Sequence, residues 1–253
     1  MENRRLTVQL ALPAGTVRVE MDVPTGDVPM EGLLPALRTT ADAFVDYATK
    51  VSEATGRPVS CAKGCGACCR QLVPVAHAEA RRLAALIDEL PEPRRSRVKE
   101  RFAEAARRVA EGGLLEALEG REAWGRGDAA GIGLQYFRLG IACPFLEDES
   151  CSIYEERPIA CREYLVTSPP ARCAEPGEAA IETVPLPTRV WAAVSREEEG
   201  RANAEAARCV PLVLVPRWAA AHRDAVTLRP GPETLRGVYA RFAHERSGQE
   251  DQG

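Results

Sequence analysis

The sequence predicts a mainly α-helical fold with irregular cysteine-rich loops and a small N-terminal β-hairpin. Three observations predict this class. Apolar residues recur at intervals of three and four along several segments, apolar and polar residues alternate near the N-terminus, and nine cysteines occur among 253 residues. With 45% hydrophobic and 28% charged residues, the chain has the composition of a folded globular protein, which excludes an intrinsically disordered one.

Residues 1–28 are predicted to form a β-hairpin appendage. Apolar and polar side chains alternate along residues 5–12 and again along 16–23, and the segment 13–15, Pro-Ala-Gly, has the composition of a turn. An isolated hairpin is only marginally stable in water, so we expect this one to lie against the main body or a partner. The alternating apolar residues are Leu6, Val8, Leu10, Val17, Val19, Met21 and Val23.

Residues 29–246 are predicted to form a single helical domain that contains a cysteine-cluster core at about 57–173. A long helix begins near Leu34 and ends before Gly56 and Pro58. Its apolar stripe either packs on the core or forms a dimer seam.

The rest of the domain is predicted to be helical outside the cysteine-rich loops. Pro91 and Pro93 separate two helices that form an αα-hairpin. The predicted segments are helices at 76–90 and 98–118, a Gly-rich loop at 120–135, a helix near 188–207, a buried strand at 210–215, a helix at 232–245 and a disordered tail at 247–253.

Charge and hydropathy limit the environment of the chain. The 33 Lys and Arg against 37 Asp and Glu give a formal net charge of −4, so no overall positive field attracts nucleic acid or an anionic membrane. Residues 1–24 lack the continuous apolar stretch of a signal peptide, and the run 209–216 is too short to span a bilayer. We therefore expect a cytoplasmic protein with reduced thiols, in which metal binding or redox chemistry is favoured over four disulfides.

The first cysteine cluster is the segment GRPVSCAKGCGACCR, residues 56–70. Core packing does not require thiols to crowd together, whereas a bound metal does. Gly64 and Gly66 permit positive φ and a tight loop, and they let backbone N–H groups approach sulfur. The segment carries Arg57, Lys63 and Arg70 and no acidic residue, so its own charge partly offsets thiolates.

The second cysteine group is the segment CPFLEDESCSIYEERPIACREYLVTSPPARC, residues 143–173. Its wider spacing suits ligands that arrive from separate loops. Taken with the first cluster, it predicts that the irregular loops surround a metal site. Thiolate ligands suit zinc, iron–sulfur clusters and copper(I). The Gly-rich loop favours an iron–sulfur cluster over zinc, and adjacent Cys68 and Cys69 favour one centre with extra thiols over two four-ligand sites.

At these motifs the sequence resembles the YkgJ-type cysteine-cluster family of zinc- or iron-chelating CxxxCxxCC domains. The resemblance rests on CAKGCGACC, on CPFLEDESCSIYEERPIACREY and on a trailing cysteine, and it covers about residues 57–173. It implies chelation of zinc or iron, and it assigns no reaction. The ligands that it implies are Cys61, Cys65, Cys68, Cys69, Cys143, Cys151, Cys161 and Cys173.

Residues next to the cysteines have two interpretations each. Arg157 and Arg162 either hydrogen-bond thiolates or pair with Glu155, Glu156 and Glu163. We expect Tyr154 and Tyr164 to shield the site from solvent. His77 either begins the helix after the cluster as a surface or capping residue or acts as an accessory ligand, and Cys209 is expected to be a buried core thiol.

Three classes of function remain open. The chain is expected to be a metal-binding protein, a redox or electron-transfer protein, or a cluster-dependent enzyme such as one that methylates lysine, an activity implied by a related cluster in flagellin-methylating proteins. Cys61, Cys65 and Cys68 have the spacing of radical-SAM enzymes, but Ala67 replaces the aromatic residue usual before the third cysteine. The sequence identifies no catalytic residue, organic cofactor site or protein partner.

Overall fold

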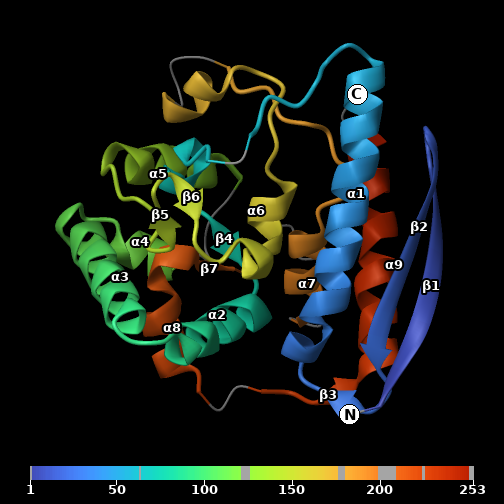
Figure 1. Ribbon diagram of the computed structural model, residues 1–253, viewed down its shortest axis with the longest axis horizontal. Coiled ribbons are helices and arrows are strands. Elements are labelled where there is room, and N and C mark those ends of the chain that lie inside the picture. Colours follow the sequence, from blue (N-terminus) through green and yellow to red (C-terminus); the bar gives the residue numbers. More distant parts are fainter. Residues whose placement is uncertain are drawn as a thin grey trace.

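The computed structural model describes residues 2–62, 64–120, 126–175, 180–198, 209–223 and 226–250, with backbone alone for 126–128 and 243–250. It confirms the predicted fold class: a mainly helical chain with an N-terminal hairpin and cysteines in irregular loops (Figure 1). In these ranges no helix is both long and apolar enough to cross a membrane.

The helices are α1 (Leu34–Ala54), α2 (His77–Glu89), α3 (Arg94–Glu111), α4 (Leu115–Glu119), α5 (Arg126–Arg138), α6 (Ile159–Glu163), α7 (Val190–Glu198), α8 (Val215–Ala221) and α9 (Gly231–Glu250). The strands are β1 (Asn3–Leu12), β2 (Gly15–Pro24), β3 (Asp27–Val28), β4 (Pro74–Val75), β5 (Leu146–Glu147), β6 (Ser150–Cys151), β7 (Val210–Pro211) and β8 (Arg229–Pro230).

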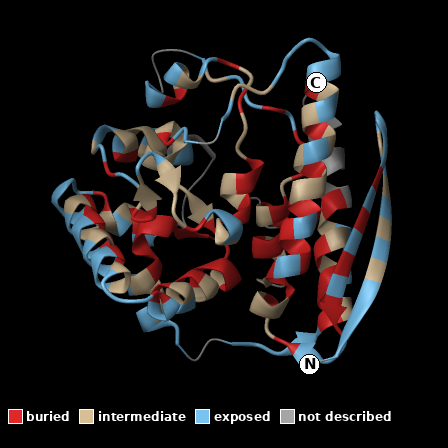
Figure 2. Ribbon diagram, viewed as in Figure 1, coloured by how far each residue is buried: buried red, intermediate tan, exposed pale blue. Residues whose placement is uncertain are grey.

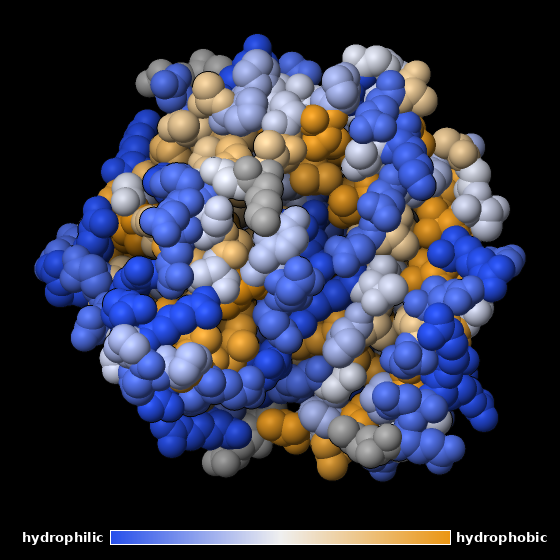
Figure 3. Space-filling model, viewed as in Figure 1, coloured by the Kyte–Doolittle hydropathy of each residue, from blue (hydrophilic) through white to orange (hydrophobic). Residues whose placement is uncertain are grey.

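The hairpin forms one side of the molecule and lies against α1 and α9 (Figure 1). β1 and β2 pair antiparallel, with Leu12 opposite Gly15, so Pro13 and Ala14 make the turn. The inward residues of β2 are buried with the facing sides of α1, α7 and α9 (Figure 2). The outward face carries charged pairs such as Arg5 with Glu20, in keeping with the many hydrophilic residues in Figure 3. This packing confirms that the hairpin lies against the main body.

A second group of helices, α2, α3, α4, α5 and α8, packs on the other side (Figure 1). The predicted αα-hairpin is present as α2 and α3. Its core contains Phe102, which meets Phe145 edge-to-face with ring centroids 5.2 Å apart. The cysteine-bearing loops lead from one group of helices to the other.

Three boundaries differ from the prediction. The helix predicted at 98–118 breaks at Gly113, which has φ of +71°, and resumes as α4. The loop predicted at 120–135 contains α5 from residue 126, because Tyr136 is buried against Val213 and Leu214 and this packing outweighs the low helix propensity of glycine. The strand predicted at 210–215 is limited to β7 and then turns into a 3₁₀ turn and α8.

Other predicted segments are only partly described. The helix predicted at 188–207 is α7 as far as Glu198, and 199–207 lie outside the described residues, as do 121–125 of the predicted loop. α9 continues to Glu250, so it includes part of the predicted tail, whose last residues, 251–253, lie outside the described ranges.

Three glutamates, of which Glu79 and Glu163 are buried and Glu198 is largely buried, connect three helices in a closed circuit. Glu79 of α2 accepts the Ile159 N–H at the start of α6 at 2.7 Å. Glu163, the last residue of α6, accepts the Val190 N–H at the start of α7 at 2.5 Å. Glu198 at the end of α7 accepts the Ala78 N–H in the first turn of α2 at 3.1 Å. Each helix therefore caps the next, and we call these residues the glutamate circuit.

Burial dominates the protonation of the glutamate circuit. Desolvation raises the pKa of Glu79, raises that of Glu163 to about 8 and raises that of Glu198 to about 7, and in each case it outweighs the hydrogen bonds and nearby arginines that lower it. Because the pKa is raised in the folded state, the proton on each carboxyl stabilises the fold. That contribution is complete below the unfolded pKa and is lost as pH rises through the folded pKa.

We predict that Glu198→Gln reduces the pH dependence of stability. In the wild-type protein, ionisation of Glu198 costs up to about 3 kcal/mol of unfolding free energy as pH rises from about 4.5 to 7, and a glutamine has no such titration. Urea unfolding at several pH values measures the difference between variant and wild type. Glu104→Gln, at an exposed ion pair with Arg107, is the control and should leave the pH dependence of the unfolding free energy unchanged. If the unfolding free energy depended on pH equally in Glu198→Gln and in the wild type, the prediction would be contradicted.

Candidate metal centre

The first cysteine cluster follows α1 and ends in the 3₁₀ turn Ala67–Arg70, which carries two of its thiols. The second group is spread over short elements: the entry to β5, the end of β6, the middle of α6 and the 3₁₀ turn Pro170–Ala174. We refer to residues 57–70 and 143–173 as the two cysteine arms. All nine cysteines lie in described residues, and none forms a disulfide.

Backbone hydrogen bonds hold the two arms together. The Cys143 N–H donates to the Cys69 carbonyl at 2.7 Å, and the Ser60 N–H donates to the Val166 carbonyl at 2.9 Å. The Val166 N–H in turn donates to the Cys61 sulfur at 3.4 Å. The 3₁₀ turns at 67–70 and 170–174 also pack against each other. The structure thus brings together cysteines from both ends of the predicted core.

Electrostatic neighbours divide the thiols into two groups. Burial and then the charges of Cys61, Cys68 and Cys65 raise the pKa of Cys173. Burial and then the charges of Cys143, Cys68 and Cys151 raise the pKa of Cys161 well above its usual value. Cys68 belongs to both neighbourhoods. One neighbourhood contains Cys61, Cys65, Cys68 and Cys173, and the other contains Cys68, Cys69, Cys143, Cys151 and Cys161.

Cys68 and Cys69 form a hydrogen-bonded pair of neighbouring thiols. The hydrogen bond from Cys69, helped by the positive charge of Arg157, lowers the pKa of Cys68 to about 7. The same bond, together with burial, raises the pKa of Cys69. The lowered pKa favours the thiolate of Cys68, which is the form that binds soft metals.

The donor set fits a soft metal, although no preformed site is present in the ranges that the structure describes: no three His, Cys, Asp or Glu side chains there are arranged to hold an ion. The arms supply eight thiols, and the sulfur of Cys61 already accepts a backbone N–H. The positive charge of Arg157 adds to the hydrogen bond from Cys69 that lowers the pKa of Cys68, and it partly opposes the burial that raises the pKa of Cys151. Sulfur donors with nearby cations match zinc or an iron–sulfur cluster.

Neither alternative for Arg162 describes its main contact. Its guanidinium forms an ion pair with Asp42 of α1 at 2.8 Å, so it fastens α6 to α1. Arg157 lies over the Tyr154 ring, with its guanidinium carbon 4.1 Å from the ring centroid. Tyr154 is 51% exposed and does not shield the site, whereas Tyr164 is half-buried near the thiols.

The two glycines of the first cluster have different roles. Gly64 has φ of +88°, as expected for a tight loop. Gly66 has φ of −92° and is instead required by close approach, since a Cβ there would lie 3.0 Å from Leu146 Cδ1 and 3.2 Å from Glu149 Cα. Arg70 closes the same contact with two hydrogen bonds to Glu149, of 2.6 and 3.0 Å. The turn between β5 and β6 therefore rests directly on the first cluster.

Sequence reasoning missed the residues that position the arms. Glu79 is the third residue of α2 and accepts the Ala76 N–H, an arrangement that a glutamate at this helical position signals. Glu149 lies in an acidic turn that indicated only a loop. His77, considered as an accessory ligand, begins α2 and stacks on Trp218 with centroids 4.7 Å apart. Cys209 is buried, as expected.

Fold and donor set define a helical protein with a thiol-rich centre in its loops. Residues 60–179 match the model of the CxxCxxCC family, described as "Putative zinc- or iron-chelating domain". This match confirms the predicted resemblance to a cysteine-cluster family, and it covers residues 60–179 of the chain. It leaves the hairpin, α1 and α7–α9 outside. No curated protein and no solved structure matches the chain.

We predict that Gly66→Ala separates the arms. The added Cβ has to displace Leu146 or the Glu149 backbone, which costs about 1–3 kcal/mol of unfolding free energy. Urea unfolding and metal content per chain measure the effect, and both should decrease.

Gly131→Ala is the matched control for this variant. Gly131 is an exposed residue of α5, and no atom lies within 4 Å of the place that a Cβ would take, so alanine should be neutral or stabilise the chain by up to about 1 kcal/mol. A Gly66→Ala protein as stable and as rich in metal as the control would show that the close approach is unimportant.

Proposed function

We propose that the chain is a cytoplasmic protein that binds an iron–sulfur cluster or zinc through the thiolates of its two cysteine arms. The observation that carries the proposal is the direct hydrogen bonding of the arms, in which the Cys143 N–H donates to the Cys69 carbonyl at 2.7 Å. This bond brings two distant segments, which carry eight thiols between them, into contact. The ligands in this proposal are Cys61, Cys65, Cys68, Cys69, Cys143, Cys151, Cys161 and Cys173.

The two neighbourhoods of thiols support a division of these ligands into two groups. Cys61, Cys65 and Cys173 share one neighbourhood with Cys68, and Cys143, Cys151 and Cys161 share the other. Cys68 is therefore the residue whose loss should affect every ligand group. Four thiolates are the usual complement of a structural zinc ion or a cubane cluster, so each neighbourhood has enough donors for one centre.

Two features favour an iron–sulfur cluster over zinc. The Val166 N–H points at the Cys61 sulfur, and hydrogen bonds of this kind tune the potential of thiolate-bound clusters. The first arm also contains the tight glycine loop that such clusters accept. A bound iron–sulfur cluster supplies one-electron redox chemistry, and a bound zinc ion supplies a structural crosslink. In either case the chain's own residues position the sulfurs and offset their charge.

We predict that protein purified without oxygen contains metal and that Cys68→Ser loses most of it. Metal analysis and the visible spectrum provide the measurement. Broad absorption that bleaches with reductant identifies an iron–sulfur cluster, and a colourless protein with bound zinc identifies the alternative. Cys209→Ser, at a buried thiol outside the arms, is the control and should retain the wild-type metal content. Less than about 0.1 equivalent of any metal in the wild-type protein would end the proposal.

Single variants in the two neighbourhoods test the division of ligands. Cys173→Ser and Cys161→Ser should each remove part of the metal if there are two centres, and each should remove nearly all of it if there is one. A metal content unchanged in both variants would contradict ligation by these thiols. A redox role requires, in addition, that the bound centre is reduced and reoxidised reversibly in a potentiometric titration.

A further inference from the structure

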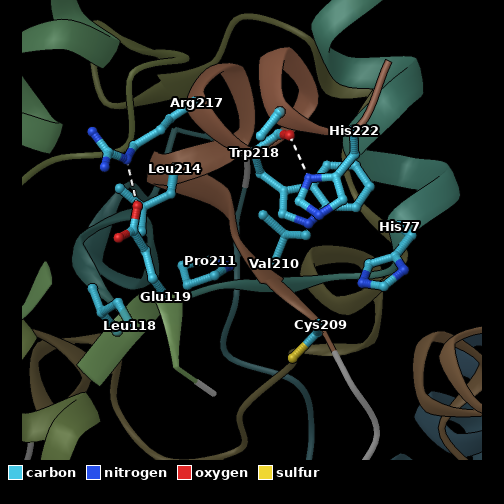
Figure 4. A pocket seen from close by; sticks show the side chains of 11 residues that line it. His77, Leu118, Glu119, Cys209, Val210, Pro211, Leu214, Arg217, Trp218 and His222 are labelled. Atoms are coloured by element: carbon cyan, nitrogen blue, oxygen red, sulfur yellow. Dashed lines mark hydrogen bonds and ion pairs between the residues drawn. The ribbon is translucent and has the colours of Figure 1, made fainter. Parts of the chain in front are cut away.

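A cavity lies outside the cysteine arms. It has a volume of about 370 Å³ and is bounded by α8 and β7, with the end of α4 and the start of α2 at its sides. Figure 4 shows the rings of Trp218 and His222 over one part of the cavity, His77 beside them and the Cys209 thiol at a distance from the two stacked rings. Cavities of this size hold small organic molecules.

The walls of the cavity are mainly apolar. Leu118 of α4 and Leu214 before α8 are buried, and Val210 and Pro211 of β7 are buried beside them. The indole of Trp218 completes this lining. A ligand here would exchange water for carbon surface, so the main contribution to its affinity would be apolar contact.

The formal charges at the cavity neutralise each other. Arg217 donates to Glu119, and both belong to the lining, at exposed positions on the rim. No unbalanced formal charge from the described lining residues is therefore available to pair with an ion. This arrangement disfavours a charged ligand, which would lose its hydration without a matching partner.

One hydrogen-bonding group at the cavity has a fixed role. The Nδ1 atom of His222 lies 2.8 Å from the Trp218 carbonyl, and a carbonyl only accepts, so Nδ1 is the donor. In the neutral imidazole, Nε2 is then an acceptor. The ring is stacked on Trp218 at 4.5 Å with an angle of 14° between the planes, and Trp218 is also stacked on His77. The acceptor is held in place before any ligand arrives.

We propose that this cavity binds a small, uncharged aromatic molecule that carries one hydrogen-bond donor, such as a phenol, an indole or an aromatic amine. The apolar walls and the ring edges take the aromatic body, the neutralised rim excludes formal charge, and His222 accepts the donor. The proposal is independent of the metal centre, because none of the cysteine-arm residues lines the cavity.

The cavity is nevertheless joined to the metal centre by the backbone. β7 pairs antiparallel with β4, with Val210 opposite Val75, and the Leu212 N–H donates to the Val73 carbonyl at 2.9 Å. Val73 follows the first cysteine arm by three residues. In this short strand pair, β7 lines the cavity and β4 follows the exit from the cysteine cluster.

Two uncharged probes of similar shape test the proposal with the full chain. N-phenyl-1-naphthylamine has an N–H donor and becomes fluorescent in apolar surroundings, whereas 1-phenylnaphthalene lacks the donor. We expect saturable binding of the amine at one site per chain. Ala221→Trp, which fills the rim at an exposed position, should weaken it at least about tenfold. His222→Phe keeps a stacked ring and removes the acceptor, and it should weaken the amine about three- to tenfold and leave the hydrocarbon unchanged.

The controls separate this site from other apolar surfaces and from the metal centre. Trp191→Phe, at a partly buried residue of α7 that packs against the core of the hairpin side, should bind both probes as the wild type does. Circular dichroism checks that each variant is folded. Binding that does not saturate, that survives Ala221→Trp or that weakens equally for both probes in His222→Phe would overturn the proposal. Cys68→Ser should retain probe binding, so failure of the metal proposal and failure of this one are distinguishable.

Discussion

The arrangement of the molecule depends on the glutamate circuit, in which three largely buried carboxyls cap three helices in turn. Burying an uncompensated carboxylate is costly, so such groups persist only where strong donors meet them. Here the donors are the orphan N–H groups at helix N-termini, which are costly to bury without partners themselves. In each pairing the carboxyl gains a donor and the helix N-terminus gains an acceptor. Because the circuit is closed from α2 to α6 to α7 and back, displacement of one helix would leave the carboxyl or the N–H groups of its neighbours unpaired.

This constraint explains how irregular loops hold their thiols near one another. The cysteine arms contain little regular structure, yet α6, which carries Cys161, is capped by Glu79 and fastened to α1 by the ion pair of Arg162 with Asp42. The first arm is attached at its other end, through Cys69 to Cys143 and through Gly66 to the turn at Glu149. Burial of the thiols and, after it, repulsion between thiolates oppose this gathering and raise the pKa of Cys161 and Cys173. A bound cation would relieve that repulsion, so metal binding and folding should stabilise each other.

Local patterns predicted those parts of the fold that are governed by local rules. Alternation found the hairpin, the three-and-four periodicity found α1 and α2, and the crowding of cysteines found the arms. The failures come from interactions between distant residues. Gly131 and Gly133 indicated a loop, but Tyr136 buries itself against Leu214 and α5 forms. The sequence indicates only ordinary charged residues at Glu163 and Glu198, because no residue near them shows that each carboxyl accepts an N–H from the start of another helix. Gly66 was correctly predicted to matter, but the predicted reason was wrong. Its close approach to Glu149, and not a positive φ, requires glycine at this position.

The family match covers the cysteine arms and only part of the cavity lining. Residues 60–179 contain all eight arm cysteines, and they also contribute Leu118 and His77 to the cavity. The opposite wall, from Cys209 through β7 to His222, lies wholly outside the matched segment. The matched segment therefore meets the elements outside it along the β4–β7 pair, where Val75 and Val210 lie opposite each other. A change in the position of β7 has to be accommodated by β4, and β4 is continuous with the segment that leaves Cys69. A molecule in the cavity would therefore contact β7, the strand that pairs with β4 at the exit from the cysteine cluster.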